Sequence, residues 1–348
     1  MSIAGLPLAR RAVLAAGRAG FGDVVAAGDD RTPSDGPRRI VALGGHVVPQ
    51  PTWLRALSLM PLEPETLYVD DGAVAVIETD QPARVLAAAA RCRSADELAR
   101  ALEGKVTVVR RPLEPTGRFA LDGAGDVRAA ETWLLRGLIK PSEGFMSRHV
   151  ERRISLAVTR RLFDTSITPN AITLVSVGIG LAGALCFLVS TSAWQTVGAL
   201  LFLTHSILDG CDGELARLKF LESRAGAVLD FWGDNLVHVA VFGCMAVGWS
   251  LGGGGVLPLV LGAVTIASAL ATATLAARRF IGGEAAATES PAGRVAEALS
   301  HRDFIYLIVA LAVFGKAHWF LALAAVGTPS FLLLFLLASR ARRTIHRP

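Results

Sequence analysis

The sequence predicts a polytopic α-helical membrane protein of six transmembrane helices, preceded by an N-terminal soluble α/β domain. Two observations support this fold class. The C-terminal half contains six windows of about 20 largely apolar residues, whereas the N-terminal half mixes charged residues with short apolar runs. A helix of about 20 residues crosses the hydrocarbon core of a bilayer, so each window is long enough to span it. The windows are residues 170–190, 194–217, 226–249, 256–277, 304–320 and 321–339.

Residues 1–135 are predicted to form the soluble domain, because helical and strand-like patterns alternate along them. The strands at 67–69 and 74–77 flank an Asp70–Asp71–Gly72 turn, which is typical of a hairpin. Asp70 and Asp71 are therefore interpreted as turn residues and not as ligands. Helices are expected at 9–20, 83–92 and 95–102, and further strands at 23–27, 39–43 and 106–110.

Residues 136–167 connect the two domains and mix apolar side chains with arginines. This composition predicts an amphipathic helix at the membrane interface, with the arginines among headgroup phosphates. An alternative is that Arg148, Arg152 and Arg153 bind a substrate phosphate, because guanidinium groups match phosphate oxygens bidentately. Thr168–Pro169–Asn170 is a helix-start pattern, so the membrane domain is expected to occupy 168–348.

The positive charges predict how this domain is oriented. Lys and Arg cluster before the first window, between the second and third, between the fourth and fifth, and after the sixth. The connections 191–193 and 250–255 carry none, so both termini are predicted to face the cytoplasm from the cytoplasmic membrane. The net charge of +5 follows largely from these flanking residues, which favours a lipid bilayer over nucleic acid as partner.

Four aspartates stand where the second and third windows meet. Asp209 and Asp212 are three residues apart, and Asp230 and Asp234 are four apart, so each pair shares one helical face. The charged connection at 218–226 predicts a cytoplasmic turn that makes the two pairs face each other. Carboxylates at membrane depth are costly unless they have partners, and hard oxygen ligands in this number suit Mg²⁺ or Mn²⁺. Two such ions would clamp a pyrophosphate.

Small residues beside these aspartates favour a ligand site. Gly213 and Ala216 remove side-chain bulk where a ligand would approach the backbone, and Gly226 allows close helix packing. Arg217 supplies a positive charge for phosphate or pairs with Glu214. Two other functions remain compatible with these acids, namely a transporter in which they line a cation path and a non-catalytic scaffold.

The pattern D-x2-D-G-x2-A-R-x8-G-x3-D-x3-D covers 26 residues and resembles, position for position, the signature of the CDP-alcohol phosphotransferase family. The resemblance implies an enzyme that uses two Mg²⁺ or Mn²⁺ ions to transfer a substituted phosphate from a CDP-linked donor to an alcohol, releasing CMP. It implies that Asp209, Asp212, Asp230 and Asp234 are the metal ligands, and that Asp234 is also the general base. The implied CDP-binding residues are Asp209, Asp212, Gly213, Ala216, Arg217 and Gly226. It also implies a homodimer.

Two wider resemblances extend this interpretation. Residues 140–340 are similar to di-myo-inositol-phosphate-phosphate synthases, and Arg302 resembles an arginine that opens their fifth span, as a phosphate ligand or a membrane anchor. The resemblance favours an inositol phosphate or related polyol phosphate as one substrate, with CDP-diacylglycerol or CDP-inositol as donor. Residues 4–30 resemble sugar-nucleotide nucleotidyltransferases without their glycine-rich signature, which favours a docking or regulatory role for residues 1–135.

His205 and His238 each lie one helical turn from an aspartate of the pattern. They are interpreted as packing residues, with hydrogen bonding to the aspartates as the alternative.

Overall fold

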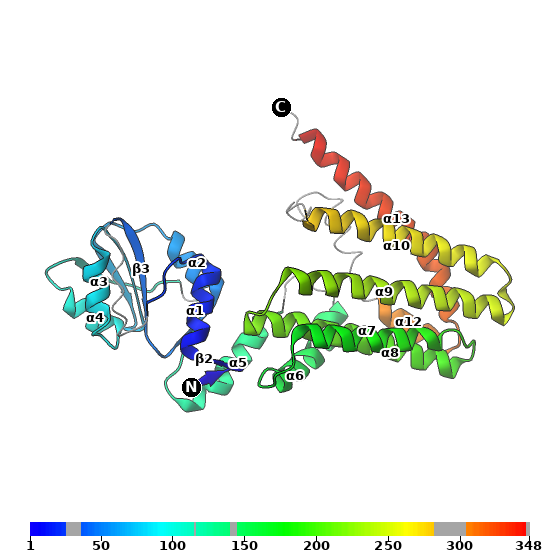
Figure 1. Cartoon of the computed structure of the whole chain (residues 1–348), viewed down its shortest axis with the longest axis horizontal. Coiled ribbons are helices and arrows are strands. Elements are labelled where there is room, and N and C mark those ends of the chain that lie inside the picture. The colour runs from blue at the N-terminus through cyan, green and yellow to red at the C-terminus, as the bar shows by residue number, and fades with distance from the viewer. Residues whose placement is uncertain (26–35, 115, 140–144, 282–303, 346–348) are drawn as a thin grey trace. The chain divides into compact units, whose positions relative to one another are not determined.

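The computed structural model describes residues 1–25, 36–114, 116–139, 145–281 and 304–345 (Figure 1). The chain divides into two compact units, Met1–Gly137 and Leu138–Pro348. Each unit has its own hydrophobic core, an α/β core in the first and a helical core in the second.

The first unit is built on a four-stranded mixed sheet with the order β3-β6-β5-β7. Strand β6 pairs antiparallel with both β3 and β5, whereas β5 and β7 pair in parallel. These strands confirm the predictions at 39–43, 67–69, 74–77 and 106–110. Their bounds are Arg38–Leu43 for β3, Thr66–Asp70 for β5, Val74–Thr79 for β6 and Thr107–Arg110 for β7.

Two short sheets and five α-helices accompany the four-stranded sheet in the described part of the first unit. The predicted helices at 9–20, 83–92 and 95–102 are confirmed as α1, α3 and α4. The helices are α1 Leu8–Ala19, α2 Pro51–Leu59, α3 Pro82–Ala89, α4 Ala95–Ala101 and α5 Val127–Arg136. The short sheets pair β1 Ser2–Ile3 with β2 Leu6–Pro7, and β4 Val47–Pro49 with β8 Arg118–Ala120.

The predicted strand at 23–27 is wrong for residues 23–25, and residues 26 and 27 lie outside the described residues. Among the described strands, β3 pairs only with β6, so residues 23–25 add no strand to its other edge. Asp23 instead forms an ion pair with Arg38, with 2.9 Å between Oδ2 and NH1.

The predicted hairpin turn is confirmed, because β5 and β6 pair in register on either side of it. Asp71 and Gly72 both adopt left-handed backbone, with φ of 47° and 63°. Asp70 also has a structural role beyond the turn. Its buried carboxylate accepts a hydrogen bond from the Leu113 backbone N–H at 2.8 Å and pairs with Arg118 at 2.8 Å.

The second unit is helical throughout the residues that the structure describes. It begins with a π-helical turn η2 Ser147–Glu151 and α6 Arg152–Leu162, followed by longer helices. Figure 1 shows α7, α8 and α9 running side by side, with α10 next to α9. The longer elements are α7 Pro169–Cys186, α8 Ser192–Lys219, α9 Arg224–Trp249, π-helical η3 Ser250–Gly254, α10 Leu257–Ile281, α12 Phe304–Val313 and α13 Ala317–Ile345.

Four helices among the described residues are long and apolar enough to cross a membrane: Pro169–Cys186, Arg224–Gly254, Leu257–Arg278 and Ala317–Leu337. Helix α8 has 28 residues, so composition and not length separates it from them. Its C-terminal turns carry the acids and bases of the carboxylate pattern. Helix α12 has 10 residues, about 15 Å at 1.5 Å per residue.

The sequence places the join between the fifth and sixth windows only roughly, near Lys316 and His318, and the structure places it at residues 314–316. Helix α12 ends at Val313 and α13 begins at Ala317. Gly315 adopts left-handed backbone with φ of 67°, and the Lys316 N–H donates to Leu311 O at 2.8 Å, which closes α12. The side chain of Gln195 accepts from the Ala317 N–H at 3.1 Å, so the first turn of α13 is anchored to α8.

Two features fix where α7 begins and how closely it packs against α8. Its start is the predicted one, because the Thr168 hydroxyl accepts from the Ala171 N–H at 3.3 Å and Pro169 follows as the first helical residue. Further along, a Cβ added to Gly183 would lie 2.9 Å from Gly198 O on α8. The backbones of α7 and α8 therefore approach closely, as small residues allow in membrane helix pairs.

Candidate active site

Three aspartates converge between α8 and α9. Asp209 and Asp212 lie on α8 and are 6% and 5% exposed, and Asp230 lies on α9. One carboxylate oxygen from each lies within 4.8 Å of the other two. We call these three residues the carboxylate group. It brings together three of the four aspartates that the sequence singled out.

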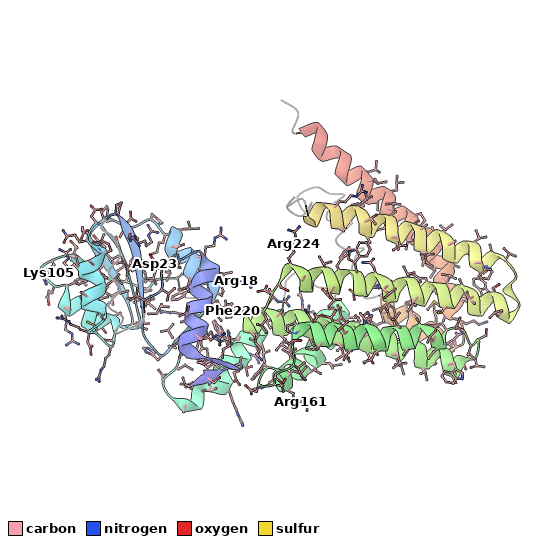
Figure 2. All side chains as sticks on the ribbon, in the orientation of Figure 1. Arg18, Asp23, Lys105, Arg161, Phe220 and Arg224 are labelled. Atoms are coloured by element: carbon pink, nitrogen blue, oxygen red, sulfur yellow. The ribbon has the colours of Figure 1, made fainter. Side chains whose placement is uncertain are left out.

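A short turn between α8 and α9 sets this geometry. Phe220 ends α8 in left-handed backbone with φ of 57°, and the Leu221 N–H donates to Ala216 O at 2.8 Å. The hydroxyl of Ser223 then caps α9 by accepting from the Gly226 N–H at 3.0 Å. Phe220 and Arg224, labelled in Figure 2, mark the two ends of the turn.

The donor set of the carboxylate group fits a divalent cation. Asp212 accepts a hydrogen bond through Oδ2 from the hydroxyl of Thr173 on α7, which orients its carboxylate. Oδ1 of Asp230 is buried and has no hydrogen-bond partner among the residues that the structure describes. A buried carboxylate oxygen without a donor is costly, and a hard cation such as Mg²⁺ or Mn²⁺ would satisfy it.

Asp234 lies one turn after Asp230 on α9 and outside the carboxylate group. Its Oδ1 is 3.4 Å from Nε2 of His205, a buried histidine on α8. This approach is not a hydrogen bond. The His205 ring also stacks on Phe202, with 6.1 Å between the ring centroids. His238 has a ring nitrogen 2.8 Å from the backbone oxygen of Asp234. Its ring packs among Phe202, Phe242 and Phe304.

The small residues of the pattern accommodate neighbouring side chains. A Cβ added to Gly213 would lie 3.1 Å from NH1 of Arg217, so the guanidinium covers the backbone at this position. At Gly226 the added Cβ would lie 3.0 Å from Oδ1 of Asn170. The absence of a side chain therefore lets the start of α9 lie close to the start of α7. Ala216 contributes its carbonyl to the turn.

Sequence reasoning missed the environment of Glu214, whose side chain is fully buried beside the carboxylate group. Its Oε1 accepts hydrogen bonds from Arg152 at 2.7 Å and from Ser155 at 2.6 Å. Its Oε2 accepts from the Thr159 hydroxyl at 2.6 Å. The available signal was the spacing of Ser155 and Thr159, which puts two hydroxyls on one face of an arginine-rich helix.

The four arginines considered for phosphate binding have different environments. Arg152 is the ion-pair partner of Glu214, with a 17% exposed side chain. Arg148 and Arg153 are exposed. Arg302 lies outside the described residues.

Residues 166–331 match the family model for CDP-alcohol phosphatidyltransferase. The inner membrane protein YnjF of Escherichia coli is 36% identical over 169 residues, which cover 47% of this chain and 73% of that protein. The chain belongs to the CDP-alcohol phosphatidyltransferase family. The matched residues include all four aspartates and exclude Arg148, Arg152 and Arg153. Together with its apolar helices, this relationship identifies an integral membrane protein.

Two further relatives are similar over shorter stretches. The "Bifunctional IPC transferase and DIPP synthase" of Thermococcus kodakarensis is 35% identical over 127 residues, 36% of this chain and 28% of that protein. The "Phosphatidylinositol phosphate synthase" of Mycobacterium marinum is 32% identical over 99 residues, 28% of this chain and 42% of that protein. The matches to four bifunctional relatives span only 25% to 35% of their lengths.

Proposed function

We propose that the helical unit is a metal-dependent transferase. It transfers a substituted phosphate from a CDP-linked donor to an alcohol hydroxyl and releases CMP, in the synthesis of a phospholipid or a phosphodiester. The observation that carries the proposal is the convergence of Asp209, Asp212 and Asp230 from two helices onto one point. Family membership supports the same reaction class.

The carboxylate group would hold Mg²⁺ or Mn²⁺, and we propose two ions, with Asp234 contributing a further oxygen to the pair. Bound there, the ions would neutralise the negative charge of the donor's diphosphate and of the departing CMP. Because the carboxylates are short side chains on α8 and α9, these two helices would fix the position of the ions. Gly213, Ala216, Arg217 and Gly226 are proposed to lie along the CDP moiety, with the guanidinium of Arg217 facing phosphate oxygens.

We assign the proton transfer to Asp234. The acceptor hydroxyl gives its proton to the Asp234 carboxylate while its oxygen forms a bond to the β-phosphorus of the donor. The bond from that phosphorus to the bridging oxygen breaks, and the electron pair leaves with CMP. His205, 3.4 Å from Asp234 Oδ1, would orient the carboxylate that takes up this proton.

The names of the relatives support an inositol-based substrate. One relative is called a phosphatidylinositol phosphate synthase. We propose an inositol phosphate or related polyol phosphate as acceptor, and CDP-diacylglycerol or CDP-inositol as donor. Arg148 and Arg153 are exposed and remain proposed contacts for the acceptor's phosphate, as does Arg302. For Arg152 the ion pair with Glu214 competes with that role.

We propose that the six predicted windows, which contain α7, α8, α9, α10, α12 and α13, are membrane segments, and that the chain forms a homodimer. The site and both termini would face the cytoplasm, because arginines flank α6 and the turn between α8 and α9. Single cysteines in the connections 187–191 and 220–223 test this orientation. We expect only the second to react with an impermeant thiol reagent applied from the cytoplasmic side of inverted vesicles.

We propose a docking or regulatory role for residues 1–135, which resemble a nucleotidyltransferase remnant. Residues 136–167 would form the interfacial linker and 168–348 the catalytic membrane domain. The tight core of β5, β6, α3 and α4 supports independent folding of the first unit. A chain that begins at residue 138 is expected to release CMP at the rate of the full chain in detergent. Loss of all activity would refute this division.

The reaction is tested with the full chain purified in detergent, supplied with Mg²⁺ or Mn²⁺ and a panel of CDP-linked donors and alcohols. CMP release that depends on donor, acceptor and metal is the expected result. Asp230→Asn should abolish it, and Gly178→Ala, at an exposed position with open space around the added carbon, serves as the matched control. Absence of CMP release from every donor, or an active Asp230→Asn protein, would refute the proposal.

A further inference from the structure

A cavity of about 190 Å³ lies at the helix ends of the second unit that are far from the carboxylate group. Its walls come from the end of α7, the start of α8, the end of α9, η3 and the start of α13. On α8 the lining residue Gln195 precedes Asp209 by 14 residues, about 21 Å at 1.5 Å per residue. The cavity is therefore separate from the candidate active site, and the proposed transfer reaction does not use it.

Hydrogen bonds between segments that are far apart in sequence hold the walls of this cavity in place. The buried side chain of Gln195 accepts from the Ala317 N–H at 3.1 Å and donates to Ser190 O at 3.3 Å. The hydroxyl of Ser190 donates to Gly248 O at 2.9 Å. A Cβ added to Gly252 would lie 2.7 Å from the Ser190 hydroxyl oxygen, so a side chain at this position would disturb the wall. The cavity is thus preformed, as ligand sites usually are.

The ionisable groups at this cavity are basic. His318 lines the cavity and packs its ring against Trp249, with 4.8 Å between the ring centroids. Lys316 stands in the connection before α13, and its charge acts on the His318 ring. No Asp or Glu occurs in the three stretches that supply the lining residues, which are 165–208, 235–281 and 304–345. These stretches therefore leave the basic pair without an acidic counterpart, and an anion would balance its charge.

Tryptophans indicate the depth of this end of the unit in the bilayer. Trp194 lies in the first turn of α8, Trp249 in the last turn of α9 and Trp319 in the first turn of α13. Tryptophan is enriched where the bilayer meets water, so this end is expected at the level of the lipid head groups. Nζ of Lys316 is 5.8 Å from the ring centroid of Trp319, which holds the ammonium group at the same level.

We propose that this cavity binds the phosphate of an anionic phospholipid head group. The ammonium group of Lys316 and a ring nitrogen of His318 would donate hydrogen bonds to the phosphate oxygens. Apolar lining side chains such as Met245 would contact the glycerol carbons. A lipid is favoured over free phosphate as the source, because the tryptophans place the cavity where head groups are concentrated.

The test is binding of phosphatidylglycerol to the full chain in detergent, counted and titrated by native mass spectrometry without a CDP-linked donor. We expect wild type to retain one phosphatidylglycerol that Lys316→Gln binds about tenfold more weakly, because a charge-assisted hydrogen bond is lost. His318→Phe keeps a ring beside Trp249 and removes the ring nitrogens, so it should also weaken binding. Lys316→Arg keeps the positive charge and should bind the lipid as wild type does.

Lys105→Gln is the matched control, because it removes the same charge from an exposed lysine of the first unit, labelled in Figure 2. It should bind phosphatidylglycerol with wild-type affinity. Wild-type affinity in Lys316→Gln, or an equal loss in Lys105→Gln, would overturn the proposal. Two competitors at equal concentration identify the ligand. Displacement by inorganic phosphate would refute a lipid as the source, and displacement by phosphatidylcholine would refute the preference for an anionic head group.

The proposed reaction and this inference fail separately, because the inference does not rest on the reaction. Asp230→Asn should release no CMP and still retain phosphatidylglycerol. A chain that binds the lipid through Lys316 and releases no CMP from any donor would refute the reaction alone. A chain that releases CMP, and whose Lys316→Gln variant binds the lipid as wild type does, would refute the lipid site alone.

Discussion

Replacing Asp234 by Asn should separate proton transfer from cation binding. Asp234 lies outside the carboxylate group, with Oδ1 3.4 Å from His205 Nε2, and the amide keeps its shape while removing its basic oxygen. Loss of a positioned general base slows a reaction by about 10²–10⁴-fold. At about 1.36 kcal/mol per factor of ten, the expected increase in the activation barrier is about 2.7–5.4 kcal/mol.

The assay measures CMP release at saturating donor and acceptor, together with Mn²⁺ binding by the same preparation. We expect kcat of Asp234→Asn to fall within that range while Mn²⁺ binding persists through Asp209, Asp212 and Asp230. Asp230→Asn is the comparison, because it should lose binding and turnover together. The reasoning is refuted if Asp234→Asn keeps wild-type kcat, or if it loses Mn²⁺ binding as completely as Asp230→Asn does.

Two further predictions concern α7. Thr173→Val removes the hydroxyl that donates to Asp212, so we expect Mn²⁺ binding to weaken by about 10–100-fold, the usual effect of losing a hydrogen bond to a metal ligand. Wild-type affinity in the valine variant would contradict this role. Gly183→Ala adds a carbon 2.9 Å from Gly198 O and should lower the free energy of unfolding by about 1–3 kcal/mol, measured by thermal unfolding in detergent. Gly178→Ala, with nothing within 4 Å of the added carbon, is its control, and equal stabilities would exclude a tight α7–α8 contact.

Local patterns predicted the carboxylate group well because its geometry is local. The three-residue spacing of Asp209 and Asp212 puts both on one face of α8, and a turn of four residues returns the chain beside it. The hairpin of β5 and β6 was predictable for the same reason, since Asp71 and Gly72 accept left-handed backbone.

Contacts between distant segments were not predictable in this way. Arg152 and Glu214 are 62 residues apart in sequence, and an arginine in an amphipathic segment is typical of a solvated or headgroup-facing position. The parallel pairing of β5 with β7 likewise depends on strand order, which no local pattern encodes. The end of α12 was only roughly placed, because apolar residues stand on both sides of Gly315 and Lys316 and blur the two helix ends.

The order of these parts along the chain has a consequence for biosynthesis. The described side chains that contact the carboxylate group, and those that hold Arg152, lie on α6 to α9, all before residue 250. The later helices α12 and α13 add buried apolar residues such as Ile305 and Phe320 to the core behind them. A ribosome that has released α9 has therefore already supplied the proposed cation ligands, while the helices that pack behind them are still to be made. A nascent chain ending after residue 254 should consequently have the ligands for a cation before it has its complete core.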